Sequence, residues 1–488
     1  MNATNFNWSP QQKEIFNWFI IGKGNLIVRA RAGAAKTSSI IEGLNRANAS
    51  SALYAVFNKK NQLEAEKKIT NKNVNVKTLH SVGFSFILKN WRGVRASGYT
   101  EFGRIKKLYP DAPEQVIFQG SRLVSYLKNS FVNPTAKEAL DTANLRDIDI
   151  AQKNIDSGWT MEKLCEMALK SIELSCEYPT DKQISFDDMV YLPVRMGWVK
   201  PFYQLVTIDE MQDLNILQLT MAIDCCLPGG KICMIGDDKQ QIYGFRGAMN
   251  NCMEIFKEKL NAKQLELTTT YRCPRHVVKL AQTLVPDINA ADNAIDGEII
   301  DCNFDSMLNS IKVKDCVLSR TNAPLMKTCL ALLRKGISSY VEGRDVGKQL
   351  ITIIDDLNSN DINDFYTKLD AWLAYRQAKV TGYNAGRAIE QATDQHETLR
   401  AIAESCLTVE DIKNKINKLF LDADFVRVPS VVCSTVHKAK GLEWDNVHLL
   451  METFASKGRV VTPEQAQEEL NIKYVSYTRA KKKLVRVT

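Results

Sequence analysis

Short apolar runs alternate with helical patterns along most of the chain. Near the N-terminus, the stretch QQKEIFNWFI predicts a helix, and the apolar run NLIVRA that follows it predicts a strand. Further β-rich segments lie at residues 52–57, 74–80, 204–210, 231–237 and 264–271. Most of them are continuously apolar, which is typical of strands buried on both faces of a parallel sheet. The pattern therefore predicts an α/β fold.

Two largely helical stretches interrupt this alternation. The first covers residues 86–185, and the second covers residues 353–424 within a second α/β series that starts near DCVLSRTNAP. In the second stretch, apolar residues recur at helical spacing, which indicates packing faces rather than a ligand surface. The predicted organisation is a first domain of residues 1–85 and 186–275 with its insertion at 86–185, and a second domain of residues 276–352 and 425–488 with its insertion at 353–424.

Composition and charge narrow the class of protein. Of 488 residues, 45% are hydrophobic and 25% are charged, which argues against disorder, collagen and coiled coil. The net charge of +8 permits a polyanionic partner without requiring one. The N-terminus lacks a signal-peptide pattern, and no apolar run reaches the roughly 20 residues of a membrane span. We expect a soluble protein with reduced cysteines and no membrane partner, acting inside a cell: in the cytoplasm or nucleoid, in the host cytoplasm if phage-encoded, or in the nucleus of a eukaryote.

The segment ARAGAAKTS, residues 30–38, lies between a predicted strand and a predicted helix. Small residues let backbone N–H groups approach phosphate oxygens, Lys36 can reach the β and γ phosphates, and the Thr37 hydroxyl can bind Mg²⁺. The pattern G-x-x-x-x-G-K-[ST] is met with alanine at both glycine positions, Ala30 and Ala35. A plain strand-to-helix turn remains an alternative for this segment alone. The Ala35 methyl group either crowds the phosphates or fits, if the residue has ordinary helical φ and ψ.

The segment LVTIDEMQD, residues 205–213, is an apolar strand that ends in two carboxylates. Asp209 can lie beside a metal ion while Glu210 orients and deprotonates an attacking water. By itself the segment could equally be a solvated acidic strand end. The phosphate loop strengthens the catalytic interpretation of this segment, since a P-loop ATPase needs such an acidic strand in the same sheet.

Further motifs occur in a characteristic order. They are WSPQQ, VFNKKNQLEAEKKI, VKTLHSVGF, ISFDDMV, GDDKQQIYGFRGA, TTTYRCP, VLSRTNAP, STVHKAKGLEWDNVHLL and YVSYTRAKKKLV. With the phosphate loop and DEMQD, they make the chain resemble superfamily 1 helicases of the UvrD/Rep group. The wording VFNK and HKAKGLEWDNVHLL is especially similar to the F-box DNA helicase branch and to phage-type relatives. The resemblance implies two RecA-like parallel-sheet P-loop domains and an ATP- and Mg²⁺-dependent DNA helicase.

The resemblance also implies roles at the nucleotide. Lys36 is then the phosphate lysine, Thr37 and Asp209 hold Mg²⁺, and Glu210 is the catalytic base. Gln240 senses the γ-phosphate, while Arg272 and Arg479 are arginine fingers that arrive from the two sides of the ATP cleft. The implied ATP-binding residues are Gln12 (adenine), Ala32, Gly33, Ala34, Ala35, Lys36, Thr37, Ser38, Tyr271 (base stacking), Arg272, Glu443 (sugar and phosphates) and Arg479.

The residues implied for DNA contact are Phe57, Asn58, Thr78, His80, Phe245, Arg246 and His437. Phe245 stands where the family usually has Trp and keeps a face for base stacking, worth about 1–3 kcal/mol per base. A lone histidine is more often a satisfied core residue, so His80 and His437 depend on their motifs. Two basic segments, residues 473–486 and the aromatic-rich 89–107, either follow a nucleic-acid backbone or form solvated faces. The mixture of aromatic and basic residues makes 89–107 the better candidate for a backbone groove.

The implied partners are single-stranded DNA, single/double-strand junctions, and single-strand-binding or recombination proteins. The GLE form of the fifth motif implies 3′ to 5′ translocation in replication, recombination or repair. One alternative is a translocase that strips proteins from DNA without efficient unwinding. The other, suggested by Ala35 and the basic segments, is a nucleic-acid-binding protein that does not hydrolyse ATP.

Overall fold

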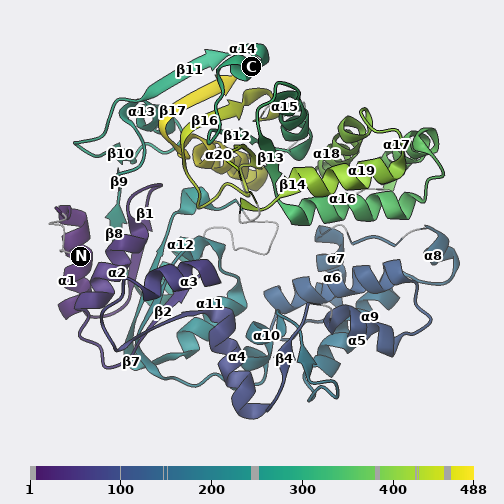
Figure 1. The fold of residues 1–488 in the computed structure, drawn as a ribbon. Helices are drawn as coiled ribbons and strands as arrows, with labels where there is room; N and C mark the ends of the chain where they lie inside the picture. The colour runs from purple at the N-terminus through teal and green to yellow at the C-terminus, as the bar shows by residue number, and fades with distance from the viewer. Residues whose placement is uncertain are drawn as a thin grey trace. The chain divides into compact units, whose positions relative to one another are not determined.

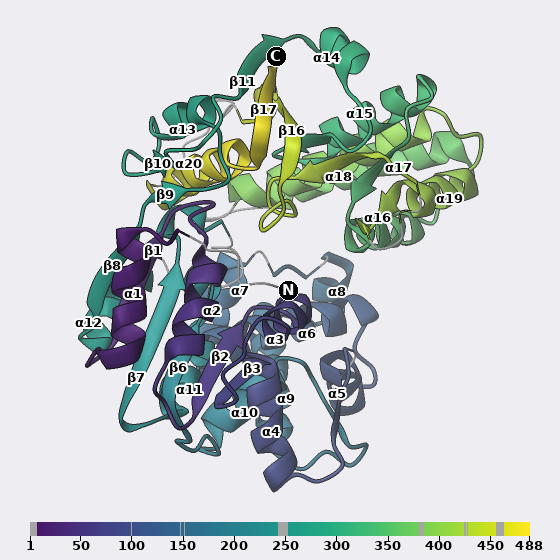
Figure 2. The same cartoon turned by 60° about the vertical axis from the view of Figure 1, so that its left-hand side comes forward.

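The computed structural model describes residues 7–98, 100–146, 148–150, 152–242, 252–379, 385–423, 426, 428–454 and 463–488. The chain forms two compact units, Met1–Thr268 and Thr269–Thr488, and Figures 1 and 2 show the ribbon of each. The boundary precedes the predicted one at residue 275, so Arg272 belongs to the second unit. No helix among the described residues is long and apolar enough to cross a membrane.

A parallel six-stranded sheet, in the order β3-β2-β6-β7-β1-β8, organises the first unit. Its strands are β1 (Leu26–Ala30), β2 (Ala52–Val56), β3 (Val74–Thr78), β6 (Tyr203–Ile208), β7 (Cys226–Gly236) and β8 (Lys263–Leu267). Along β1, Leu26 and Val28 belong to one hydrophobic cluster while Ile27 belongs to another. Both faces of the strand are therefore buried, which explains its continuously apolar sequence.

Helices cover this sheet and connect its strands. They are α1 (Pro10–Ile21), α2 (Lys36–Arg46), α3 (Lys59–Glu66), α4 (Leu79–Asn90), α11 (Ile216–Asp224) and α12 (Cys252–Leu260). Short 3₁₀ turns η1 (Met211–Asp213) and η2 (Asp238–Gln240) follow β6 and β7. Because β1, β6 and β7 are neighbours and parallel, the residues after them meet at one edge of the sheet, where α/β folds bind their ligands.

The first insertion starts and ends at a small parallel pair, β4 (Arg95–Ala96) with β5 (Gln183–Ile184). Between them lie α5 (Thr100–Leu108), α6 (Glu114–Ser130), α7 (Ala136–Leu145), α8 (Gln152–Asp156) and α9 (Met161–Ser175), and α10 (Asp188–Arg195) leads back to β6. A buried charge cluster ties the insertion to α10: Lys128 of α6 contacts Asp188 and Glu101, and Arg104 contacts the same two carboxylates.

A parallel seven-stranded sheet, in the order β11-β17-β16-β12-β15-β13-β14, organises the second unit. Its strands are β11 (Glu298–Cys302), β12 (Cys316–Ser319), β13 (Ser339–Glu342), β14 (Phe420–Leu421), β15 (Val431–Thr435), β16 (Trp444–Leu450) and β17 (Ala480–Val487). The remaining elements are β9 (Thr269–Thr270), β10 (Asn289–Ala290), α13 (Arg275–Ala281), α14 (Phe304–Ser310), α15 (Asn322–Arg334), α16 (Arg344–Leu357), α17 (Ile362–Lys379), α18 (Ala385–Ala403), α19 (Val409–Leu419), η5 (Met451–Phe454) and α20 (Pro463–Tyr477). The predicted α/β class with two parallel sheets is confirmed.

Candidate functional site

The predicted phosphate loop connects β1 to α2. Gly33 and Ala35 both have left-handed backbone conformations, with φ of 70° and 57°, and the N–H of Ala34 donates to the carbonyl of Arg31 at 3.1 Å. For a residue that carries Cβ, this conformation costs about 1–2 kcal/mol because Cβ crowds a carbonyl oxygen. Ala35 therefore does not have the ordinary helical φ and ψ considered above. At Ala35 the loop has the left-handed backbone conformation that glycine adopts without cost, although this residue carries a methyl group.

The first turn of α2 is suited to bind an anion. Its N-cap residue, Ala35, has no side-chain oxygen to accept from the N–H groups of this turn, and no capping bond is made there. The first N–H groups of a helix lack intrahelical partners and attract negative charge. A phosphate would satisfy these donors, so the loop fits the nucleotide that its sequence predicts.

Four predicted residues of two motifs lie in direct contact. Lys36 Nζ is 3.0 Å from Glu210 Oε2, and Thr37 Oγ1 donates to Asp209 Oδ2 at 3.2 Å. Asp209 also accepts a 2.9 Å bond from the hydroxyl of Tyr54 on β2. The sheet thus brings together the lysine, the hydroxyl and the two carboxylates that the motifs predicted.

Burial and neighbouring charges shift the pKa values of Asp209 and Lys36. Burial raises the pKa of Asp209 to about 6, together with repulsion from Glu210, although Lys36 opposes the shift. Burial also lowers the pKa of Lys36, but attraction to Glu210, Asp237 and Asp209 outweighs it, so this pKa is raised. A cation beside Asp209 would offset the repulsion between the two carboxylates and the cost of burying their charge. Mg²⁺ commonly uses one carboxylate and one hydroxyl together with phosphate oxygens. Thr37 and Asp209 therefore fit a Mg²⁺ site.

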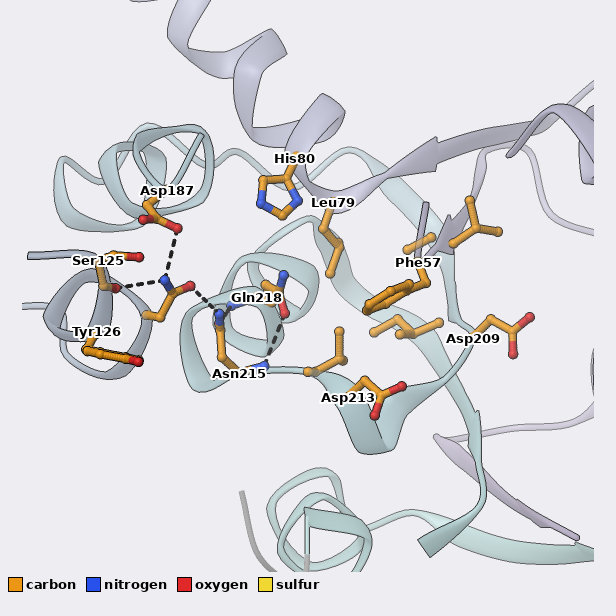
Figure 3. A pocket seen from close by; sticks show the side chains of 15 residues that line it. Phe57, Leu79, His80, Ser125, Tyr126, Asp187, Asp209, Asp213, Asn215 and Gln218 are labelled. Atoms are coloured by element: carbon orange, nitrogen blue, oxygen red, sulfur yellow. Dashed lines mark hydrogen bonds between the residues drawn. The ribbon is translucent and has the colours of Figure 1, made fainter. Parts of the chain in front are cut away.

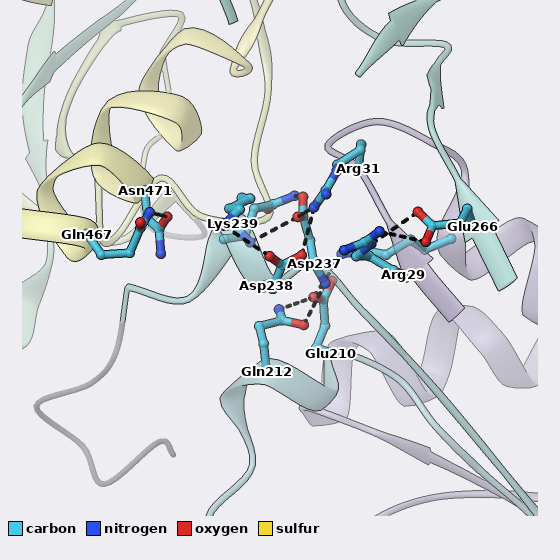
Figure 4. Close-up of polar contacts among 12 residues, drawn as sticks. Arg29, Arg31, Glu210, Gln212, Asp237, Asp238, Lys239, Glu266, Gln467 and Asn471 are labelled. Atoms are coloured by element: carbon cyan, nitrogen blue, oxygen red, sulfur yellow. Dashed lines mark hydrogen bonds and ion pairs between the residues drawn. The ribbon is translucent and has the colours of Figure 1, made fainter. Parts of the chain in front are cut away.

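A second polar network follows β7 (Figure 4). Arg31 of the phosphate loop contacts Asp237 at 3.1 Å and Asp238 at 2.7 Å. Gln240, the predicted γ-phosphate sensor, donates from Nε2 to Asp237 Oδ2 at 2.7 Å. Burial raises the pKa of Asp237, while Arg31 outweighs burial at Asp238 and lowers its pKa. Gln240 is thereby joined to the phosphate loop through Asp237 and Arg31.

Gln12, the predicted adenine reader, has a structural role. Its carboxamide accepts from the N–H of Ser9 at 3.0 Å, which forms the capping box that begins α1, and donates to Ser39 Oγ at 2.9 Å. The side chain is buried. These two bonds join the start of α1 to α2, and the adenine role stays a prediction.

Arg272 and Arg479, the predicted arginine fingers, both lie in the second unit, and their approach to the nucleotide stays a prediction. Arg272 Nε contacts Glu443 Oε2 at 2.5 Å. Arg479 is 1% exposed and donates to the carbonyls of Val475 and Leu442 at 3.0 and 3.1 Å. Burial lowers the pKa of Arg479 to about 10, with a further contribution from Arg272. The fold thus brings together three predicted ATP-binding residues, while Tyr271, the fourth in this unit, is half exposed.

A cavity of about 350 Å³ lies in the first unit (Figure 3). Phe57 and His80, two predicted DNA-contact residues, line it together with Asp209. Phe57 is 49% exposed, and burial lowers the pKa of His80. The other lining residues are Ala55, Val56, Leu79, Ser125, Tyr126, Asn129, Asp187, Ile208, Asp213, Leu214, Asn215 and Gln218. The cavity therefore connects predicted DNA-contact residues with the acidic end of β6.

The other predicted DNA-contact residues have different surroundings. Asn58 caps α3 by accepting from the N–H of Asn61, and Thr78 caps α4 by accepting from Ser81. His437 is partly buried after β15. Phe245 and Arg246 lie outside the described residues. The two capping side chains have a structural role that requires no DNA.

Several side chains of the two basic segments form ion pairs. On β17, Lys482 contacts Asp445 at 2.8 Å and Lys483 contacts Glu298 at 3.4 Å. In the first insertion, Lys107 contacts Asp181, and Arg104 lies in the buried charge cluster. These pairs favour structural or solvated roles for the residues that form them, and the contact of the two segments with a nucleic-acid backbone stays a prediction.

Four residues of the site were not predicted from the sequence: Arg31, Tyr54, Asp237, and Gln212, whose Nε2 donates to Glu210 Oε2 at 2.6 Å. The adjacent acids in GDD and the arginine inside ARAGAAKTS were available signals for the Arg31–Asp237 pair. Tyr54 had none, because it occupies an ordinary inward position of a buried strand.

Comparisons with known proteins agree with this geometry. Residues 8–261 match the UvrD/REP helicase N-terminal domain, and residues 358–487 match the UvrD-like helicase C-terminal domain. The chain is 26% identical to F-box DNA helicase protein 1 of Schizosaccharomyces pombe, over 94% of this chain and 55% of the relative. It is 24% identical to F-box DNA helicase 1 of Gallus gallus, over 97% and 48%, and 22% identical to a probable DNA helicase II homolog of Mycoplasma pneumoniae, over 98% and 84%. The chain thus spans about half the length of the two F-box proteins.

Proposed function

This chain belongs to the UvrD/Rep helicase family, and we propose that it is an ATP-dependent DNA helicase that moves along single-stranded DNA. The observation that carries the proposal is the meeting of Lys36 with Glu210 and of Thr37 with Asp209 at one edge of the first sheet. These residue types provide charge neutralisation, a metal site and a base for the hydrolysis of a phosphoanhydride.

The residues of the first unit divide the work on the nucleotide. Lys36 and the first turn of α2 bind the phosphates, and Thr37 with Asp209 hold Mg²⁺. When bound, Mg²⁺ and ATP supply an activated phosphoryl group. Glu210 orients the attacking water and takes its proton. Gln240 senses the γ-phosphate. It is linked to the phosphate loop because it donates to Asp237, which forms an ion pair with Arg31 of the loop.

Arg272 and Arg479 stabilise the negative charge that develops on the transferring phosphoryl group. Both are held ready by protein groups: Arg272 by Glu443, and Arg479 by two carbonyl oxygens. We expect this hydrolysis to drive the movement along the DNA strand. The GLE segment supports 3′ to 5′ movement, and single-stranded DNA with its junctions is the substrate class.

ATP hydrolysis with and without single-stranded DNA tests the proposal, with Glu210→Gln as the control variant. We expect turnover that DNA stimulates strongly and that the variant loses by about 10³-fold or more, as for loss of a catalytic group. DNA binding without any turnover in the unaltered protein would contradict the proposal and favour a nucleic-acid-binding protein. Strand separation on a substrate with a 3′ tail, compared with a 5′ tail, then tests unwinding and its direction.

A further inference from the structure

Gln212 connects the end of β6 to the end of β7. Its side chain is buried in η1. Nε2 donates to Glu210 Oε2 at 2.6 Å, and Oε1 accepts from the N–H of Asp237 at 3.1 Å. Figure 4 shows Gln212 beside Glu210. The carboxamide of Gln212 thus binds the carboxylate of Glu210 through its nitrogen and the main chain of Asp237 through its oxygen.

The fold leaves room for this carboxamide at Gly236. A Cβ atom on Gly236 would lie 2.3 Å from Gln212 Oε1 and 2.6 Å from Met211 Cγ. Such a distance is far shorter than van der Waals contact, so an alanine at this position would have to displace Gln212 or Met211. Position 236 requires glycine because the side chain of Gln212 occupies the space that a Cβ atom would need.

Glu210 needs such support. Its backbone is left-handed, with φ 52° and ψ 46°, a conformation that a residue with Cβ adopts at an energetic cost. Glu210 Oε2 accepts from Lys36 as well as from Gln212. In the proposed reaction Lys36 turns to a phosphate, whereas both partners of Gln212 belong to the protein. The bond from Gln212 therefore persists when the bond from Lys36 is given up.

We propose that Gln212 is a positioning residue that fixes the carboxylate of Glu210 where it can take a proton from the attacking water. This inference rests on the proposed role of Glu210 as the base. Gln212 does so without contacting the nucleotide, because its two bonds go to Glu210 and to the main chain of Asp237. Gly236 is part of this arrangement, since its lack of a side chain leaves room for the carboxamide at the end of β7.

The test uses the whole chain and DNA-stimulated ATP hydrolysis. Gln212→Met keeps the length of the side chain and removes both hydrogen bonds. A hydrogen bond to a charged group that is lost only from the reacting geometry lowers kcat by about tenfold or more. We expect that loss in kcat with KM for ATP changed by less than about twofold. Gly236→Ala should produce the same split by displacing the carboxamide.

A matched control exists on β8, where Gln264 donates to Glu266 Oε1 at 2.8 Å with the same spacing of two residues. Gln264→Met should leave kcat and KM unchanged. A second measurement separates positioning from folding: in a Glu210→Gln background, Gln212→Met should cause less than about twofold further loss, because the two residues act as one unit.

The outcomes are distinguishable. An unaltered protein without turnover refutes the proposed function itself. An active protein whose Gln212→Met variant keeps its kcat refutes only the positioning role. A variant whose loss is fully additive with Glu210→Gln, or whose loss follows a lowered unfolding temperature, refutes it as well.

Discussion

Lys128 Nζ lies 2.5 Å from Asp188 Oδ1, and neither side chain is exposed to solvent. Lys128 also contacts Glu101, so the cluster joins the helical insertion to α10. Burial alone would raise the pKa of Asp188, but Lys128 and Arg104 outweigh it, and the pKa is lowered. The cluster contributes to the stability of the first unit only while Asp188 is ionised.

Acid should therefore destabilise this unit. A carboxyl group whose pKa is lower in the folded state contributes stability above its unfolded pKa of about 4, and loses it as pH falls through the folded value. At pH 7, Lys128→Met should lower the free energy of unfolding by up to about 3–5 kcal/mol, because the buried Asp188 loses its nearer counter-charge and keeps only Arg104, at 3.3 Å. The deficit should shrink below about pH 4, where protonation removes that charge. Urea unfolding at several pH values measures both effects.

The control for this variant is an exposed pair, Lys263 with Glu14. Lys263→Met should change the free energy of unfolding by less than about 1 kcal/mol at any pH, since surface pairs contribute little. An equal effect of the two substitutions would contradict the importance of burial.

The strained alanine of the phosphate loop gives a second prediction. Ala35→Gly removes the crowding of Cβ but adds backbone freedom to the unfolded chain, for a net stabilisation of up to about 1 kcal/mol. ATP hydrolysis should be retained or increased, since no methyl group then faces the phosphates. Ala34 is buried and is not left-handed, so Ala34→Gly should destabilise the protein instead. Urea unfolding and KM for ATP compare the two variants, and a destabilised Ala35→Gly protein would show that the loop is not strained.

The two arginines of the second unit should respond differently to lysine. Arg479 makes three bonds, to two carbonyl groups and the Thr478 hydroxyl, from a fully buried guanidinium. Lysine lacks the planar fork of donors, so Arg479→Lys should lower both stability, by about 1–3 kcal/mol, and hydrolysis. Arg272 is more exposed, and its partner Glu443 is partly in solvent. Arg272→Lys should therefore lower hydrolysis, by about 10³-fold for an arginine finger, with less than about 1 kcal/mol of destabilisation. Thermal unfolding beside turnover distinguishes them; equal destabilisation would contradict this account.

Phe57 offers a test of the DNA path. Its ring lines the cavity and is half exposed, so Phe57→Ala should cost little stability. Loss of one stacked base should weaken single-stranded DNA binding by about 1–3 kcal/mol. Phe202 is also exposed and does not line the cavity, so Phe202→Ala serves as the control in fluorescence anisotropy titrations. Equal affinities for the two variants would remove Phe57 from the DNA path.

Local sequence determined much of this protein. Buried parallel strands require continuously apolar runs, and small residues between strand and helix identify a phosphate loop, so both sheets and the placing of Lys36 and Asp209 could be predicted. The order of the motifs identified the family, because the motifs keep the residue types that the family uses at its nucleotide site.

The tertiary structure decided what local sequence leaves open. The left-handed φ of Ala35 depends on how β1 and α2 are joined. The buried Arg479 finds one of its two carbonyl partners at Leu442, 37 residues earlier in the chain. Gln212 is ordinary in sequence, and its role arises because the sheet places the ends of β6 and β7 side by side. Lys482 and Lys483 of β17 meet acids on neighbouring strands, because strand register fixes which side chains meet. The contacts of Gln212 with Asp237, of Arg479 with Leu442 and of the β17 lysines join residues far apart in the chain, and no local pattern encodes their distances.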